Sequence, residues 1–185
     1  MCPQQQQTGQ RAVQAAAYQF KQGPDVPERA IAALPYLLPL LDALPYGRYV
    51  FLQFPFIARA MAPLAPVAYL YNSVPFLPFI LFIGVYSFIV NNQSMGRFIR
   101  YNAMQAVLLD ILLIIPSVLM SSVLRPPEGG VALQLYEQGL NTIFLFVAVS
   151  VAYGMGSCAV GQTPRLPLVA DAASKQLGGD GPSGL

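Results

Sequence analysis

The amino-acid sequence predicts an all-α, polytopic membrane protein: a bundle of four transmembrane helices with an additional apolar segment in the membrane interface. Of its 185 residues, 55% are hydrophobic and only 10% are charged, whereas soluble domains carry about 25% charged residues. Apolar stretches also recur along the chain, over 50–124 and again over 140–160, instead of concentrating in one short core. Such a chain has too few charges to cover a surface in water, so lipid is its natural solvent.

The composition also excludes several classes of function. The sequence contains no histidine, which removes imidazole bases, Ser-His-Asp and Cys-His nucleophile systems and nearly every usual zinc site. Neither a GxxxxGK[ST] loop nor a GxGxxG fingerprint occurs. The net charge of +2 is small, and no basic stripe with interleaved aromatic residues is present. We therefore expect no enzymatic activity, no cofactor or metal, and no nucleic-acid partner.

Residues 1–27 form a polar leader that we expect to be disordered or to contain a short helix. The leader is rich in glutamine, and up to Pro24 it carries Arg11 and Lys21 without an acidic residue. Organellar transit peptides share this lack of acidic residues, but a solvated tail would have the same composition. Whether the leader belongs to the mature chain therefore stays open.

The first membrane span has two candidates in the sequence. Residues 49–71 exceed the ~20 residues needed to cross the hydrocarbon and end in tyrosines, which favour membrane interfaces. Residues 30–44 are shorter and contain Asp42 and two prolines. A span over 49–71 gathers most basic residues on the side of both termini, as the positive-inside rule requires. We predict that span, with 30–44 in the interface, although Arg59 within it costs ~2.5–3.5 kcal/mol.

Three further stretches are apolar enough to span the membrane, and they cover about 74–91, 103–124 and 139–160. Two prolines and two glycines at 126–130 predict a turn between the last two spans. Arg97 and Arg100, which precede the third span, are expected to anchor it near anionic headgroups. The glycine-rich residues 176–185 predict a disordered tail.

Four polar residues within the apolar stretches are candidates for lining a conduit through the membrane. Asp110 and Arg59 are each expected about ten residues inside the membrane from the same face, or ~15 Å deep at 1.5 Å per residue. They could therefore pair, either to line a polar path or only to neutralise two costly charges. Asn102 and Gln105 open the third span, and their amides should point inward because lipid leaves them without partners.

Small residues at helical spacing predict close packing between the spans, because they let helix backbones approach closely in lipid. A pathway for a substrate would use similar residues, so composition does not separate the two roles. The residues concerned are Gly84, Ser87, Ala106, Ser117, Gly154 and Gly156.

Four sequence motifs resemble a known family. The most specific is RFIRYNAMQAVLLDILL at 97–113, and it is accompanied in order by ALPYLLPLLD at 33–42, YNSVPF at 71–76 and GQTPRLPLVAD at 161–171. Together they resemble the small four-helix membrane subunit of the translocon at the inner envelope of chloroplasts (Tic), which has cyanobacterial relatives. The resemblance covers roughly residues 28–175.

The resemblance implies a multi-pass subunit of the chloroplast inner-envelope import translocon that forms, or contributes to, the membrane conduit for preproteins. It implies other Tic subunits, the Toc machinery, preproteins in transit and membrane lipids as partners. Both termini would then lie on the stromal side. No catalytic residue is implied. A membrane scaffold for other translocon subunits and a small-solute or ion channel are the alternatives.

Overall fold

In the computed structural model, residues 23–122 and 126–178 are described, and every regular element among them is a helix. The first five elements run end to end as one rod of 28 residues, Val26–Gln53. Proline interrupts the α-helical hydrogen bonds because it has no N–H, and two short 3₁₀ turns within the rod contain Pro35 and Pro45. The elements are α2 (Val26–Ala33), η1 (Leu34–Tyr36), α3 (Leu37–Ala43), η2 (Leu44–Gly47) and α4 (Arg48–Gln53).

Beyond the rod, the chain turns sharply at Phe54, whose φ of −127° and ψ of 80° are not helical. Pro55 starts the next helix, a first-turn position where its missing N–H costs nothing. A second corner lies at Phe76, which has a left-handed φ of 62°; the helical segments before and after this corner are bent by 103°. These segments comprise α5 (Pro55–Met61), η3 (Ala62–Leu64) and α6 (Ala65–Ser73), then α7 (Leu77–Val85) and the π-helical turn η4 (Tyr86–Val90).

The last three helices are α8 (Arg97–Ser122), α9 (Gly130–Ala159) and α10 (Ala170–Gln176). The rod, α8 and α9 are each long and apolar enough to cross a membrane, and the bent pair 55–73 and 77–90 provides a fourth crossing if it acts as one span. The predicted class, an all-helical protein with about four apolar membrane segments, is therefore confirmed.

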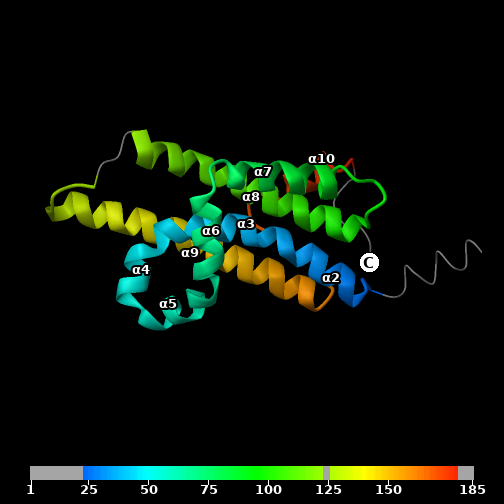
Figure 1. The fold of residues 1–185 in the computed structure, drawn as a ribbon, viewed down its shortest axis with the longest axis horizontal. Coiled ribbons are helices and arrows are strands. Elements are labelled where there is room, and N and C mark those ends of the chain that lie inside the picture. The colour runs from blue at the N-terminus through cyan, green and yellow to red at the C-terminus, as the bar shows by residue number, and fades with distance from the viewer. Residues whose placement is uncertain (1–22, 123–125, 179–185) are drawn as a thin grey trace, which may run out of the picture.

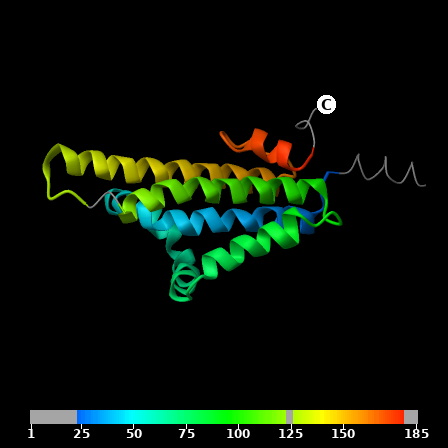
Figure 2. The ribbon, with the colours of Figure 1, turned by 90° about the horizontal axis from the view of Figure 1, so that it is seen from above.

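The rod occupies the centre of the bundle. It packs against both α8 and α9, which contact each other only sparsely, while α7–η4 and α10 cover other faces of α8 (Figures 1 and 2). Tyr36 of the rod, Leu109 of α8 and Phe144 of α9 are all fully buried. Large side chains therefore fill the space between the three long helices.

This arrangement corrects the prediction for the first span. Residues 30–44, expected in the interface, lie in the core of the bundle, where Ala32, Tyr36, Leu40 and Ala43 are buried. Residues 49–71, expected to form one span, are divided at Phe54: residues 49–53 end the rod, and the helices that start at Pro55 project sideways from the bundle (Figure 1). The prediction was wrong because it treated the prolines as breaks in the helix. The rod instead continues past them by 3₁₀ turns.

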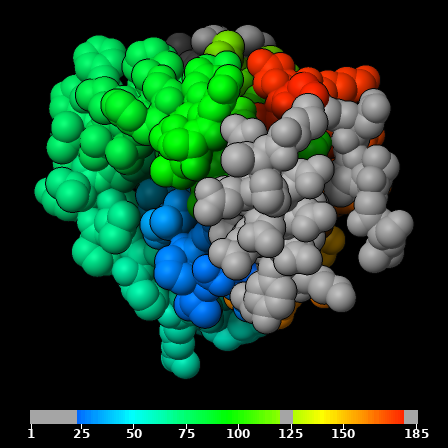
Figure 3. All heavy atoms as spheres, turned by 90° about the vertical axis from the view of Figure 1, so that its right-hand side faces the viewer, coloured from blue at the N-terminus to red at the C-terminus, as the bar shows by residue number. Residues whose placement is uncertain are grey.

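The other three predicted spans coincide with helices, although with different ends. Residues 74–91 correspond to α7 and η4, 103–124 to α8, and 139–160 to α9, which begins about two and a half turns earlier than expected. The beginning of α2, the end of α9 and α10 lie at the same end of the bundle (Figures 1 and 2), and Figure 3 looks onto that end. The predictions for the leader up to residue 22 and for the tail from residue 179 lie outside the described residues.

Candidate intramembrane polar site

A fully buried tyrosine joins the three long helices. Tyr36 of the rod donates a hydrogen bond from its hydroxyl to Oδ1 of Asn102 on α8, at 3.1 Å. The Asn102 amide in turn donates to the carbonyl of Phe98, at 2.8 Å. On α9, Gly154 faces the ring so closely that a Cβ atom there would lie 2.7 Å from Tyr36 Cζ. The ring is therefore fixed by a hydrogen bond to α8 and by a glycine on α9.

The hydrogen bond between Tyr36 and Asn102 allows a direct test. Tyr36→Phe leaves the buried Asn102 oxygen without its donor, so we expect the free energy of unfolding to fall by about 1–3 kcal/mol. Asn102→Leu removes the acceptor from the Tyr36 hydroxyl and should act similarly. The double variant should lose less than the sum of the two, as measured by thermal unfolding in detergent. Strictly additive losses would show that the two groups do not interact.

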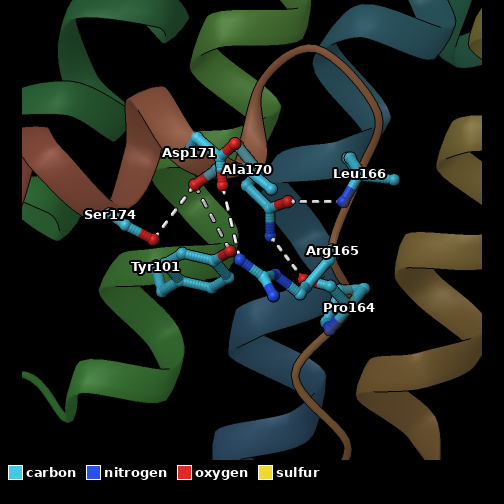
Figure 4. A network of polar contacts seen from close by, with 8 residues as sticks. Tyr101, Pro164, Arg165, Leu166, Ala170, Asp171 and Ser174 are labelled. Carbon is cyan, nitrogen blue, oxygen red and sulfur yellow. Dashed lines mark hydrogen bonds and ion pairs between the residues drawn. The ribbon is translucent and has the colours of Figure 1, made fainter. Parts of the chain in front are cut away.

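Gln105, one turn further along α8, binds the main chain that follows α9. Its side-chain amide donates to the Pro164 carbonyl at 3.1 Å, and its oxygen accepts from the Leu166 N–H at 2.9 Å (Figure 4). Both main-chain groups are thereby satisfied at a buried position, where unpaired groups are costly. Gln105 consequently fixes the strap, by which we mean residues 162–178, against α8.

The strap has further contacts around Gln105. The hydroxyls of Tyr101 and Ser174 both donate to the Ala170 carbonyl, at 3.4 and 3.1 Å. Arg165 and Asp171 form an exposed ion pair of 3.3 Å on the outer side (Figure 4). An exposed pair of this kind contributes at most about 1 kcal/mol, so the buried amide bonds of Gln105 dominate the attachment. The amides of Asn102 and Gln105 are thus engaged inside the protein and do not line an open path.

Asp110 lies deeper along α8, where it meets a second carboxyl group. Asp42 of the rod lies close enough for the two side chains to interact electrostatically, and the Tyr71 hydroxyl of α6 lies near both groups. One Asp110 oxygen, Oδ1, and the Tyr71 hydroxyl oxygen are buried without a hydrogen-bond partner. The two carboxyl groups border a cavity of 530 Å³.

The anticipated pairing of Arg59 with Asp110 is wrong. Arg59 is exposed on α5, and in the part of the chain that the structure describes it forms no ion pair with Asp110. The expectation of equal depth assumed one straight span over 49–71, which the corner at Phe54 breaks. Asp110 faces another acid instead of a base.

The small residues predicted to pack between helices fall into two groups. Ala106 and Gly154 are buried between the long helices. Gly84 and Gly156 have no other residue within reach of a Cβ atom, and Ser87 and Ser117 are exposed, Ser117 at the edge of the cavity.

The two predicted anchors lie at the end of the bundle that holds both ends of the described chain. Arg97 begins α8 and is exposed. Arg100 is partly buried and donates to the Val90 carbonyl at 2.8 Å, which caps the π turn of η4. Arg100 therefore stabilises the end of η4, in addition to its predicted role as an anchor at the membrane interface.

Sequence reasoning missed Tyr36 and Asp42 as members of the polar site. The signal for Asp42 was present, because a carboxyl group within an apolar stretch is as costly as Asp110 and calls for a partner at the same depth. Tyr36 carried no such signal, since tyrosine is common near membrane interfaces. Its role depends on Gly154 and Asn102, which lie far away in the sequence.

Comparisons with known proteins bear on the function of this arrangement. A family model described as chloroplast import apparatus, Tic20-like, matches residues 2–173. The chain is 42% identical to "Protein TIC 20-II, chloroplastic" of Arabidopsis thaliana over 151 residues, which are 81% of this chain and 72% of the relative. It is 39% identical to "Protein TIC 20-v, chloroplastic" of the same plant, over 83% of this chain and 72% of the relative. It is 34% identical to a "Tic20 family protein" of the cyanobacterium Synechocystis, over 83% of this chain and 94% of the relative.

Proposed function

Since the chain belongs to the Tic20-like family of the chloroplast import apparatus, we propose that it borders, without enclosing, the path of preproteins through the inner envelope. As a translocon subunit it would do so beside other Tic subunits, with the Toc machinery delivering the preproteins. The observation that carries the proposal is the position of the rod at the centre of the bundle. An extended polypeptide with its side chains is about as wide as a helix, ~10 Å, and the interior is already occupied.

The path must then run along an outer face that other subunits complete. The face formed by the rod, α6 and α8 is the best candidate, because it presents polar groups at the cavity of Asp42 and Asp110. The outer surfaces of α7 and η4 are different, since exposed Phe79, Ile80 and Phe88 give them the composition of a lipid-facing or subunit-facing surface.

We also propose that the end of the bundle with both ends of the described chain faces the stroma. Five basic residues of the described ranges belong to elements that meet at this end, namely Arg29, Arg97, Arg100, Arg165 and Lys175. Arg48 lies beyond the middle of the rod, away from this end, and Arg59 follows it on α5. This distribution follows the positive-inside rule.

The test is site-specific photocrosslinking to a preprotein arrested midway across the inner envelope. A photoreactive phenylalanine would replace Tyr69, which is 77% exposed on α6. The matched control is Ile115, which is 63% exposed on α8; it does not line the cavity, whereas Tyr69 shares a face of α6 with Asn72, which does. We expect the preprotein to crosslink at position 69 and not at position 115.

Crosslinks from position 69 to other subunits alone, with none to the preprotein, would contradict the proposal. The chain would then be a scaffold, and the path would be lined elsewhere.

A further inference from the structure

Residues 55–85, which comprise α5, η3, α6 and α7, form a flap on the outside of the bundle. All of them are described by the structure, and only Tyr71 among them is buried. The rod, α8 and α9 each contribute several buried side chains to the core. Figure 2 shows the flap on one side of the rod and α9 on the other. The flap is therefore a peripheral segment with a single buried side chain.

The side chains of the flap contribute little that would hold it in place. Those of α7 are all apolar and cannot form hydrogen bonds. On α6, Asn72 and Ser73 donate to carbonyls of their own helix, at 2.7 and 2.6 Å. Apolar helices gain no hydrophobic energy by associating in lipid, because acyl chains are as apolar as their side chains. Van der Waals packing is therefore the main contribution of these side chains to holding α6 and α7 against the bundle.

The position of the flap also leaves two buried polar atoms without partners. They are the hydroxyl oxygen of Tyr71 and Oδ1 of Asp110, and the two residues are 3% and 8% exposed. Buried polar atoms are normally paired, and leaving them unpaired is costly. The cavity of 530 Å³ beside them is lined by Asn72 of the flap and by residues of the rod and α8. Outward movement of α6 would connect both atoms with this cavity and remove that cost.

The backbone of the flap departs from regular helix at the places where it would bend. Phe76, between α6 and α7, has a left-handed φ of 62°, which is uncommon for a residue other than glycine. After α7 the chain forms the π-helical turn η4, a rare conformation that is frequent at functional sites. Arg100 of α8 donates to the Val90 carbonyl at 2.8 Å and so attaches the end of this turn to the bundle. The turn η4 is therefore the fixed end about which the flap can pivot.

We infer that the flap is a lateral gate, which swings away from the rod and α8 about η4 and opens the cavity between them toward the side of the bundle. The inference rests on the proposed function for what the gate admits, a segment of the preprotein that passes along the rod and α8. An extended polypeptide is about as wide as a helix, ~10 Å. We therefore expect α6 to move outward by about that distance.

The experiment measures the distance between two spin labels by pulsed electron paramagnetic resonance. The full-length chain, with Cys2 and Cys158 replaced by alanine, is reconstituted in lipid vesicles. One label replaces Tyr69, which is 77% exposed on α6, and the other replaces Val149, which is 67% exposed on α9. The matched control combines Val149 with Ile115, which is 63% exposed on α8.

We expect two populations for the pair 69–149, one with the flap closed and one about 10 Å longer with the flap open. The pair 115–149 should show one distance, because both of its labels are on long helices of the bundle. When the labelled chain is assembled into the translocon with an arrested preprotein, the longer distance of the pair 69–149 should become the major one.

The variant Tyr71→Phe tests the reason for opening. It keeps the ring but removes the unpaired hydroxyl, so the closed position loses its cost and the ratio of open to closed chains should fall about tenfold. The control is Tyr153→Phe, since Tyr153 is 51% exposed on α9 and its replacement should leave the ratio unchanged. A ratio that stays the same or rises in Tyr71→Phe would contradict the inference.

A single distance for the pair 69–149, the same with and without the preprotein, would show that the flap is fixed and would overturn the inference. If a photoreactive residue at position 69 still crosslinks to the preprotein in that case, the proposed function stands. Two populations without any such crosslink would support the movement of the flap and contradict the proposed function. A single distance together with no crosslink would overturn both.

Discussion

Replacement of Gly154 by alanine is expected to lower the free energy of unfolding by about 1–3 kcal/mol, even though alanine is the better helix former. The added Cβ atom would lie 2.7 Å from Tyr36 Cζ and 2.8 Å from Cε1, distances that real Cβ atoms do not tolerate. The ring cannot move aside easily, because it is fully buried and its hydroxyl is bonded to Asn102. The rod must therefore move away from α9.

Gly156→Ala is the matched control, because it lies on the same helix and no other residue is within 4 Å of its added Cβ. Its stability should stay the same or rise by up to about 1 kcal/mol through helix propensity. Thermal unfolding of both purified variants, followed by circular dichroism in the same detergent, measures the difference. Equal stability of the two variants would show that the rod does not depend on close contact with α9.

The second large effect is expected for Gln105→Leu. Leucine has a similar size but leaves the Pro164 carbonyl and the Leu166 N–H, both bonded to Gln105, without partners. Each unsatisfied buried group costs about 1–3 kcal/mol, so the strap should detach from α8 far more often. Trypsin cleavage after Arg165 reports this detachment, because the bond to be cut adjoins the Leu166 N–H. We expect the cleavage rate to rise at least about tenfold, as 1.4 kcal/mol already implies.

Ser174→Ala is the control for the strap. Its hydroxyl donates only to the Ala170 carbonyl, four residues earlier in the same segment, so the bonds to Gln105 remain. Cleavage after Arg165 should be nearly unchanged in this variant. An unchanged rate in Gln105→Leu as well would mean that other contacts of α10 with α8 are sufficient to hold the strap.

The helical class and the positions of the helices near 74–91, 103–124 and 139–160 could be predicted from the sequence, because length and apolarity alone determine which segments suit lipid. The rod could not be predicted in the same way. Its prolines and Asp42 are unfavourable in an isolated helix facing lipid, and only the surrounding α8 and α9 make this segment suitable for the core. The low helix propensity of this segment is outweighed by its tertiary packing, and a single sequence does not show which segments pack together.

The polar site was predictable to a similar extent. The buried positions of Asn102 and Gln105 follow from the cost of an amide in lipid, but the partners of the two amides do not. Tyr36 is 66 residues before Asn102, and Leu166 is 61 residues after Gln105. Charge reasoning assigned Arg59 to Asp110 because opposite charges usually pair, whereas the fold brings Asp42 to this carboxyl group.

The central position of the rod has a consequence for biogenesis. The rod is the earliest of the long helical segments to emerge during synthesis, yet it is less apolar than either α8 or α9. Asp42 and the prolines make its independent insertion unfavourable, while α8 and α9 supply the surfaces that bury Tyr36 and Leu40. We therefore expect the rod to become stably integrated only after α8 and α9, which follow it in the sequence, have entered the bilayer.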